Sequence, residues 1–253
     1  MVLANILGLL KENNSIWMNE AADLLYPRSC AVCGIGRPDA RRHLCWECHA
    51  DIMPITHPYC SLCGDPVSGR IDHSYICHFC SDVNPAFSIA RSAAHYAGPI
   101  AEMLKALKYR KATWLVPDLA SMLSALVYQH IEVDEIDAVT FVPLHHTRRR
   151  EREYNQSALL ARDLARIIDK PYMNRIIYRH RKTTSQTSLT ARERISNVRN
   201  SFRYRNRSWL QGRRILLVDD VMTTGATVNE CAKTLKKGGA SKVYVVAVAR
   251  GMK

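Results

Sequence analysis

The cysteines are the feature that most constrains the fold of this 253-residue chain. Eight of the nine lie between Cys30 and Cys80, in four pairs that each have two residues between the cysteines. The surrounding segment, 28–83, is rich in Cys, His, Pro and Gly and shows little helical or strand periodicity. Such a segment cannot bury a sizeable apolar core of its own, so bound metal or cross-links must hold it together.

The spacing within the pairs predicts metal ligands. Two intervening residues let both sulfurs of a tight turn face one ion, and two such turns complete a tetrahedral Zn²⁺ site. Gly34 and Gly64 each follow a pair, where this turn commonly needs a left-handed backbone. The simplest assignment is two structural zinc ions, with a crossed pairing or a histidine in place of one cysteine left open. The predicted ligands are Cys30, Cys33, Cys45 and Cys48 for one ion, and Cys60, Cys63, Cys77 and Cys80 for the other.

Net charge and hydropathy limit the partners and the compartment. Lys and Arg exceed Asp and Glu by 13, and the pI is near 9.5. This balance favours polyanions such as nucleic acid, an anionic membrane surface or phosphorylated small molecules. No apolar run approaches the roughly 20 residues that a transmembrane helix needs, and Met1–Leu10 lacks the features of a secretory signal. We expect a cytoplasmic protein, in which clustered cysteines bind metal rather than form disulfides.

A strand, a loop and a helix are predicted around Ile215–Thr227. Apolar residues 215–218 form a buried strand, Asp219 and Asp220 follow it, and small or hydroxylated residues lead into a helix. The carboxyl ends of parallel strands bind ligands in open sheets, and the N–H groups of a helix N-terminus suit phosphate. The carboxylates would repel phosphate and therefore suit ribose hydroxyls. The pattern predicts a ribose 5-phosphate site, and it is neither a dinucleotide fingerprint nor a P-loop.

Alternating strands and helices after Phe87 predict an α/β domain with a parallel sheet covered by helices on both faces. A polar, basic stretch from His180 to Asn206 is predicted to be a loop. The predicted strands are 89–96, 138–142, 175–178, 215–218 and 243–249, and the predicted helices are 99–108, 115–130, 156–168 and 227–237.

The strand, loop and acidic pair resemble the phosphoribosyl-pyrophosphate motif of type I phosphoribosyltransferases. The resemblance implies that Asp219 and Asp220 contact the ribose of 5-phosphoribosyl-1-pyrophosphate (PRPP). The residues implied to hold the 5-phosphate are Thr223, Thr224, Gly225, Ala226 and Thr227.

Three further stretches, Phe141–His145, Arg148–Ser157 and Arg179–Phe202, together with the cysteine pairs, resemble the ComF family of competence-associated and DNA-utilisation proteins. The resemblance implies an N-terminal helical segment (1–26), a double zinc ribbon (27–84) and a type I phosphoribosyltransferase-like domain (85–253). The implied PRPP-binding residues are Pro143, Leu144 and His145 in a pyrophosphate loop, Arg148, Arg152, Asn155 and Gln156 beside it, and Arg181, Thr184 and Gln186 in a loop that closes over the ligand. One departure is visible, because the family usually has Gly-Phe where this chain has Glu153-Tyr154.

The family resemblance implies a PRPP-binding, phosphoribosyltransferase-like protein that uses Mg²⁺ with PRPP and serves DNA uptake or the utilisation of external DNA. No residue identifies an acceptor substrate, so phosphoribosyltransferase activity stays an open hypothesis. The alternative is a non-catalytic, basic protein that binds single-stranded DNA or acts as an adaptor, with the PRPP pocket kept as a sensor or a vestige. A competence helicase or another uptake component is a further candidate partner.

Overall fold

The computed structural model describes residues 28–38, 42–181 and 191–251. The chain divides into two compact units, with the boundary between Asp51 and Ile52. The first cysteine cluster belongs to the first unit, and the second cluster belongs to the same unit as the sheet. The predicted segment 1–26 lies outside the described residues, so the predicted domain boundaries stay a prediction.

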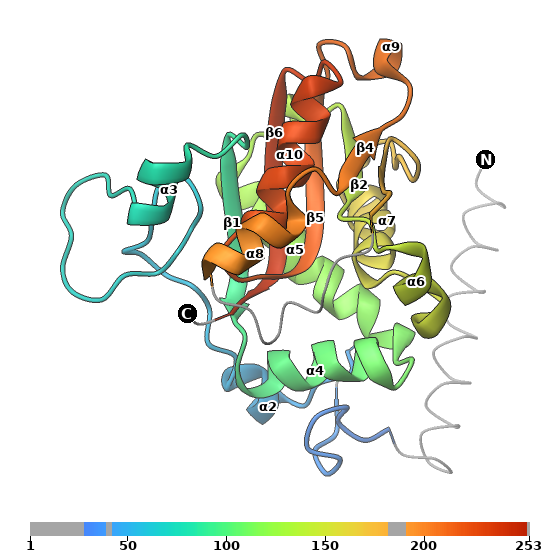
Figure 1. The fold of residues 1–253 in the computed structure, drawn as a ribbon. Helices are drawn as coiled ribbons and strands as arrows, with labels where there is room; N and C mark the ends of the chain where they lie inside the picture. Colours follow the sequence, from blue (N-terminus) through green and yellow to red (C-terminus); the bar gives the residue numbers. More distant parts are fainter. Residues whose placement is uncertain (1–27, 39–41, 182–190, 252–253) are drawn as a thin grey trace, which may run out of the picture. The chain divides into compact units, whose positions relative to one another are not determined.

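A four-stranded parallel sheet in the order β1-β6-β5-β2 forms the second unit's centre (Figure 1). Apolar residues fill β6 and the first half of β5 almost without interruption, as expected for strands that are covered on both faces. The strands are β1 Ile89–His95, β2 Ala138–Phe141, β5 Arg214–Met222 and β6 Lys242–Arg250. The predicted parallel sheet is confirmed.

Helices cover both faces of this sheet (Figure 1). Helix α10, Ala226–Lys237, packs against β5 and β6 on one face. On the other face α5, Val116–His130, packs against β1 and β6, and α7, Gln156–Ile167, packs against β2 and β5. Further helices of this unit are α3 His78–Val83, α4 Gly98–Tyr109 and α6 His146–Arg152, with short 3-10 turns η1 Thr113–Leu115 and η2 Val133–Glu135. Helix α2, Trp46–Ala50, belongs to the first unit. The four predicted helices of the α/β domain are confirmed within two residues.

The basic stretch predicted to be a loop contains regular structure. Strand β3, Ile177–Arg179, pairs antiparallel with β4, Phe202–Tyr204. Helix α8 occupies Ala191–Val198, and α9 occupies Arg207–Leu210. The buried side chains of Val198, Phe202 and Leu210 anchor this ribbon, with β4 packed on α10. These apolar residues are too widely spaced to produce a periodic pattern, which is why the sequence prediction missed α8, β4 and α9, whereas β3 lies within two residues of the strand predicted at 175–178.

In the parts of the chain that the structure describes, no helix has both the length and the apolar character that a bilayer span requires.

Candidate functional site

The acidic pair lies on a strand rather than after one. β5 does not end at Val218 but continues to Met222, so Asp219 and Asp220 are its sixth and seventh residues. The Asp219 side chain is buried, with 8% of its surface exposed, while Asp220 is half-buried. The strand is longer than predicted because Asp219 and Val221 keep parallel pairing with Ala247 and Ala249 of β6.

Asp219 is held from the segment that begins α7. Ser157 Oγ donates to Asp219 Oδ1 at 3.1 Å, and the Asp220 amide donates to the same oxygen at 3.0 Å. Ser157 is placed by Asn155, which caps α7 by accepting from the Ser157 amide at 3.0 Å. Burial, together with the adjacent charge of Asp220, raises the pKa of Asp219 to about 8. Asp219 therefore keeps its proton to a higher pH than an ordinary carboxyl group does, and Asp220 lies next to it.

Lys108 completes the arrangement around the acids. Its ammonium group lies 2.7 Å from Asp220 Oδ2, and both side chains are about 15% exposed or less. Burial opposes the lysine's charge, but the charges of Asp220 and Asp219 outweigh it and raise the pKa of Lys108. Lys108 was not among the residues predicted for the site. Its position one helical turn after the buried Leu104 could have indicated that Lys108 lies on the inward face of α4.

The loop after the acids leads through a left-handed glycine into the N-terminus of α10. Gly225 caps α10 with a φ of 80°, a left-handed conformation that favours glycine. Thr224 is buried, and its Oγ1 accepts from the Ala226 amide at 3.4 Å. A Cβ on Gly251 would lie 2.8 Å from Thr223, so glycine lets the end of β6 pass close beside the loop. The predicted strand, loop and helix are present, and Gly251 is a contact that the sequence did not reveal.

The predicted pyrophosphate loop, Pro143–His145, joins β2 to α6. Asn155 Nδ2 donates to the Val142 carbonyl at 3.0 Å and thereby ties this loop to the start of α7. His145 is buried and caps α6, with its ring nitrogen accepting from the Thr147 amide at 3.4 Å. The contacts of His145 are therefore those of a residue that shapes the loop.

The other predicted ligand residues fall into two groups. Arg152 donates to Gln156 Oε1 at 3.2 Å and lies over the Tyr109 ring at 5.5 Å, so both side chains stay near α4 and α7. Arg181 instead donates to the carbonyls of Asn197 and Arg199 and joins the end of β3 to α8. Arg148 is half-buried on α6, and Thr184 and Gln186 lie outside the described residues.

Arg179 is a further cation of the antiparallel ribbon, and the sequence prediction did not include it. It lies on β3 with its guanidinium 5.3 Å from the centre of the Phe202 ring. Burial lowers the pKa of Arg179, and the negative charge of Asp219 partly opposes that shift. The antiparallel ribbon therefore holds a half-buried arginine against the Phe202 ring.

Each cysteine cluster has the geometry of a tetrahedral zinc site. The four sulfurs of each predicted set lie within 4.8 Å of one another, which supports the simple pairing over the crossed one. Two neighbouring sulfurs are 3.8 Å apart in the first cluster and 3.6 Å apart in the second. Bonds of about 2.3 Å from sulfur to zinc place tetrahedral sulfurs ~3.8 Å apart. The clusters therefore fit zinc, and these separations are too long for disulfide bonds.

The turns around the sulfurs follow the predicted form. Gly34 and Gly64 have φ values of 73° and 65°, as predicted for the residue after each first pair. Backbone amides point at sulfur, with Gly36 N lying 3.4 Å from Cys33 Sγ and Cys77 N lying 3.3 Å from Cys60 Sγ. Such N–H groups stabilise the thiolate form that binds zinc.

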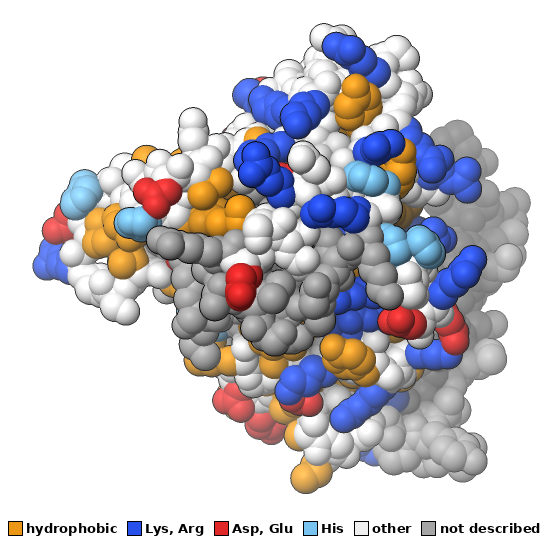
Figure 2. All heavy atoms as spheres, viewed as in Figure 1, with side chains coloured by type: hydrophobic (Ala, Val, Ile, Leu, Met, Phe, Trp, Pro, Cys, Tyr) orange, Lys and Arg blue, Asp and Glu red, His pale blue; other side chains and the backbone are white. Residues whose placement is uncertain are grey.

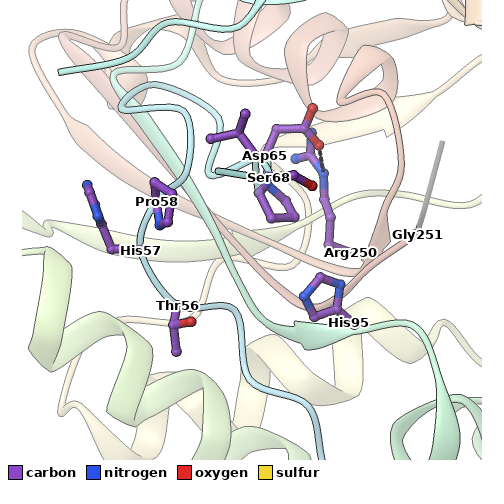
Figure 3. A pocket seen from close by; sticks show the side chains of 10 residues that line it. Thr56, His57, Pro58, Asp65, Ser68, His95, Arg250 and Gly251 are labelled. Carbon is purple, nitrogen blue, oxygen red and sulfur yellow. Dashed lines mark hydrogen bonds and ion pairs between the residues drawn. The ribbon is translucent and has the colours of Figure 1, made fainter. Parts of the chain in front are cut away.

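The second cluster is part of the core of the sheet-containing unit. Its cysteines share one hydrophobic cluster with Met222 and Val228, which flank the loop between β5 and α10. Arg250, at the end of β6, is 2% exposed and donates to the Cys63 carbonyl at 2.9 Å. The same guanidinium pairs with Asp65 at 2.8 Å, and both side chains border a cavity of about 460 Å³ beside His95 (Figure 3). A buried arginine thus joins this cluster to the sheet.

Comparison with known proteins agrees with the two-part reading of the sequence. The double zinc ribbon domain model matches residues 21–82, and the phosphoribosyl transferase domain model matches residues 155–253. Competence protein F of Haemophilus influenzae is 32% identical over 225 residues, covering 87% of this chain and 96% of that protein. The DNA utilization protein YhgH of Escherichia coli strain K12 is 32% identical over 221 residues, covering 82% and 96%.

A more distant relative gives the same result. Competence protein ComFC of Bacillus subtilis is 28% identical over 214 residues, covering 82% of this chain and 83% of that protein. The resemblance drawn from the cysteine pairs, the acidic strand and the three basic stretches is therefore confirmed, and this chain belongs to the ComF family of competence and DNA-utilisation proteins.

Proposed function

We propose that the site at the carboxyl end of β5 binds PRPP together with Mg²⁺. In this proposal Asp219 and Asp220 accept hydrogen bonds from the ribose hydroxyls, and the loop Thr223–Thr227 holds the 5-phosphate. The names of the matching relatives refer to competence and DNA utilisation, so we assign the protein a role in DNA uptake or in the use of external DNA.

One observation carries the proposal. Two adjacent acids, one of them paired with the half-buried Lys108, precede a helix that begins after a left-handed Gly225. The acids can accept from hydroxyl groups, while the first amides of α10 can donate to phosphate. A sugar phosphate presents these two kinds of group at opposite ends, so one molecule satisfies both parts of the site.

A buried donor supports the same assignment. Gln156 is 1% exposed, and its Oε1 accepts a hydrogen bond from Arg152. Its Nε2 is the other polar atom of the side-chain amide. Among the described residues Nε2 has no hydrogen-bond partner. An unpaired buried donor is costly, and a ligand oxygen would remove that cost.

The acids also suit Mg²⁺, because carboxylate oxygens are the ligands that this ion takes beside substrate phosphates. The ion would offset the charge of the pyrophosphate group. Lys108 contributes a positive charge at the same place, and Ser157 keeps Asp219 in position.

Transfer of the ribosyl group needs an acceptor, so the proposal concerns binding, and an acceptor screen follows only once binding is established. A cytoplasmic location belongs to the proposal, because four-cysteine sites need reduced thiols.

Calorimetric titration of PRPP with Mg²⁺ into the zinc-loaded chain tests the proposal. The wild type is expected to bind, and an Asp219→Asn, Asp220→Asn double variant is expected to lose binding. An Asp72→Asn, Asp134→Asn variant removes the same charge from two exposed positions and should bind like the wild type. Equal binding by all three proteins, or no binding by a folded wild type, would contradict the proposal.

The charge of the surface favours the alternative function, a basic protein that binds single-stranded DNA. Figure 2 shows Lys and Arg side chains gathered over the side that carries α6, β4 and α9. Such binding weakens steeply with salt because phosphate contacts release counterions. Salt-dependent binding of an oligonucleotide by a wild type that does not bind PRPP would favour this alternative. A competence helicase or another uptake component stays a candidate partner under either function.

A further inference from the structure

Given the proposed function, on which this inference rests, we propose that Phe79 is a positioning residue for the loop Thr223–Thr227. Phe79 belongs to the second knuckle, residues 60–83, which carries the second cysteine cluster and α3. The double zinc ribbon model ends at residue 82, whereas the loop lies in the phosphoribosyl transferase model, which begins at residue 155. The structure places the second knuckle and the loop in one compact unit. The second knuckle therefore contributes to the affinity of the proposed phosphate site.

The Phe79 ring packs against the glycine that caps α10. A Cβ on Gly225 would lie 3.8 Å from Phe79 Cε1, 3.9 Å from Met222 Sδ and 4.0 Å from Val228 Cγ2. Met222 and Val228 belong to the same strand and helix as the loop, whereas Phe79 comes from a distant part of the sequence. Glycine adopts positive and negative φ values about equally well, so its neighbours must hold it in one conformation. Phe79 supplies part of that restraint.

A hydrogen bond ties the same end of α10 to the chain that follows the second knuckle. The Ala86 amide donates to Asn229 Oδ1 at 2.8 Å, and Asn229 is 4% exposed. The Asn229 amide in turn donates to the Gly225 carbonyl at 2.9 Å and closes the first turn of α10. The turn whose amides face the proposed phosphate is therefore fixed from outside the helix.

The start of the loop is connected to the second knuckle through the end of β6. The Gly251 amide donates to the Met222 carbonyl at 3.0 Å, directly before the loop. Arg250, the neighbour of Gly251, is buried and donates to the Cys63 carbonyl at 2.9 Å. Both ends of the loop are thus connected to the segment that carries Phe79.

This arrangement has a consequence for ligand affinity. A ligand binds only those molecules in which the loop already has its binding conformation, so the apparent affinity falls in proportion to their fraction. We expect loss of the Phe79 ring to reduce that fraction to about one tenth, which weakens PRPP binding about 10-fold.

Calorimetric titration of PRPP with Mg²⁺ into the full, zinc-loaded chain tests the inference. Phe79→Ala should bind about 10-fold more weakly than the wild type, while Phe79→Tyr keeps the ring and should restore wild-type affinity. Without ligand, the amides of Ala226 and Thr227 should exchange hydrogen faster in Phe79→Ala than in the wild type, because the loop opens more often. Zinc content should be the same in all three proteins, since every cysteine is kept.

Leu62 provides a matched control within the second knuckle. Like Phe79, it is half-buried and packs against the hydrophobic cluster that contains the four cysteines. Its carbonyl, however, accepts from the Ala90 amide of β1 at 2.7 Å. Leu62→Ala should therefore lower stability but leave the PRPP affinity and the exchange of the loop amides unchanged. An equal loss of affinity in Leu62→Ala and Phe79→Ala would overturn the specific role of Phe79.

Two further variants keep the test decisive if Phe79→Ala fails to fold. Phe79→Leu keeps an apolar side chain without the ring, and Asn229→Ala removes the acceptor for the Ala86 amide. Each should weaken PRPP binding and speed exchange of the same loop amides. A wild type that binds no PRPP would overturn both the proposed function and this inference. A wild type that binds PRPP, with Phe79 and Asn229 variants that bind it equally well, would overturn this inference alone.

Discussion

The ammonium group of Lys108 lies 2.7 Å from Asp220 Oδ2, and the two side chains are 15% and 14% exposed. Lys108 stands near the end of α4 and Asp220 on β5, so the ion pair joins a helix to the strand that carries the proposed ribose site. A charge that loses its partner in such a place keeps its desolvation cost without compensation. The pair therefore both fixes α4 and balances one of two adjacent acids.

We expect Lys108→Met to lower the free energy of unfolding by about 2 kcal/mol at pH 7, because Asp220 would stay largely buried without its cation. Urea denaturation followed by circular dichroism measures this change. A Lys108→Met, Asp220→Leu double variant should recover most of the loss, since it removes both charges. If the double variant is as unstable as the sum of two single losses, the two residues are not energetically coupled.

Asp219→Asn is expected to stabilise the protein in a pH-dependent way. The folded-state pKa of Asp219 is raised to about 8, above the ordinary value of about 3.9. The folded state therefore favours the protonated acid, and stability falls as pH rises from about 4 through about 8. Asparagine carries no such proton, so the variant should gain on the order of 5 kcal/mol at pH 8 relative to the wild type, the equivalent of roughly four pKa units, and little at pH 4.

Thermal unfolding between pH 4 and pH 9 measures this difference. Asp72→Asn, at an exposed position, serves as the comparison for loss of one carboxylate. A stability gap between Asp219→Asn and the wild type that stays constant across the pH range would show that the burial of Asp219 does not perturb its titration.

The second cysteine cluster should support the sheet-containing unit directly. Phe79, next to Cys80, lies within 3.8 Å of where a Cβ on Gly225 would stand, and Arg250 bonds to the Cys63 carbonyl. A structural zinc site contributes on the order of 10 kcal/mol, comparable with the whole stability of a domain. We therefore expect Cys63→Ser to remove one of two zinc ions and to abolish cooperative unfolding of this unit.

Metal analysis and amide hydrogen exchange test this prediction together. Cys33→Ser should also remove one zinc ion, but it alters the cluster of the other compact unit. Protection of the β5 and β6 amides should therefore fall strongly in Cys63→Ser and little in Cys33→Ser. An equal loss of protection in both variants would show that the second cluster has no special connection with the sheet.

Much of the fold could be predicted because its signals are local. The strand Ile215–Val218 is a continuous apolar run, and the cysteine pairs are recognisable from spacing alone. Gly34 and Gly64 were predicted to be left-handed from their positions after a pair, and both are. Each of these features depends on residues within a few positions of one another.

The missed features depend on contacts between distant segments. Lys108 reaches Asp220 only because α4 and β5 meet, and Ser157 reaches Asp219 only because α7 packs on β5. Strand β4 forms because Phe202 is buried against α10, which no pattern within 180–206 indicates. The sequence therefore predicted the acidic strand and the cysteine pairs, but not the distant residues that contact them.

The backbone at Glu153 leads to the last prediction. This residue has a φ of 67°, a left-handed conformation that costs a residue with a Cβ about 1 kcal/mol, and the family usually has glycine there. Its carboxylate pairs with Lys111, but both side chains are about two-thirds exposed, so the pair contributes under about 0.5 kcal/mol. We expect Glu153→Gly to raise the free energy of unfolding by about 1 kcal/mol, as measured by urea denaturation.

Glu153→Ala separates the backbone effect from the charge. Alanine removes the carboxylate but keeps the Cβ, so it should leave stability unchanged or slightly lower, while glycine raises it. If alanine and glycine stabilise the protein equally, the gain comes from loss of the charge and the left-handed backbone carries no measurable strain. If glycine alone stabilises the protein, the left-handed backbone at Glu153 lowers the free energy of unfolding. This strained residue then lies in the turn between α6 and α7 that positions Asn155 and Ser157.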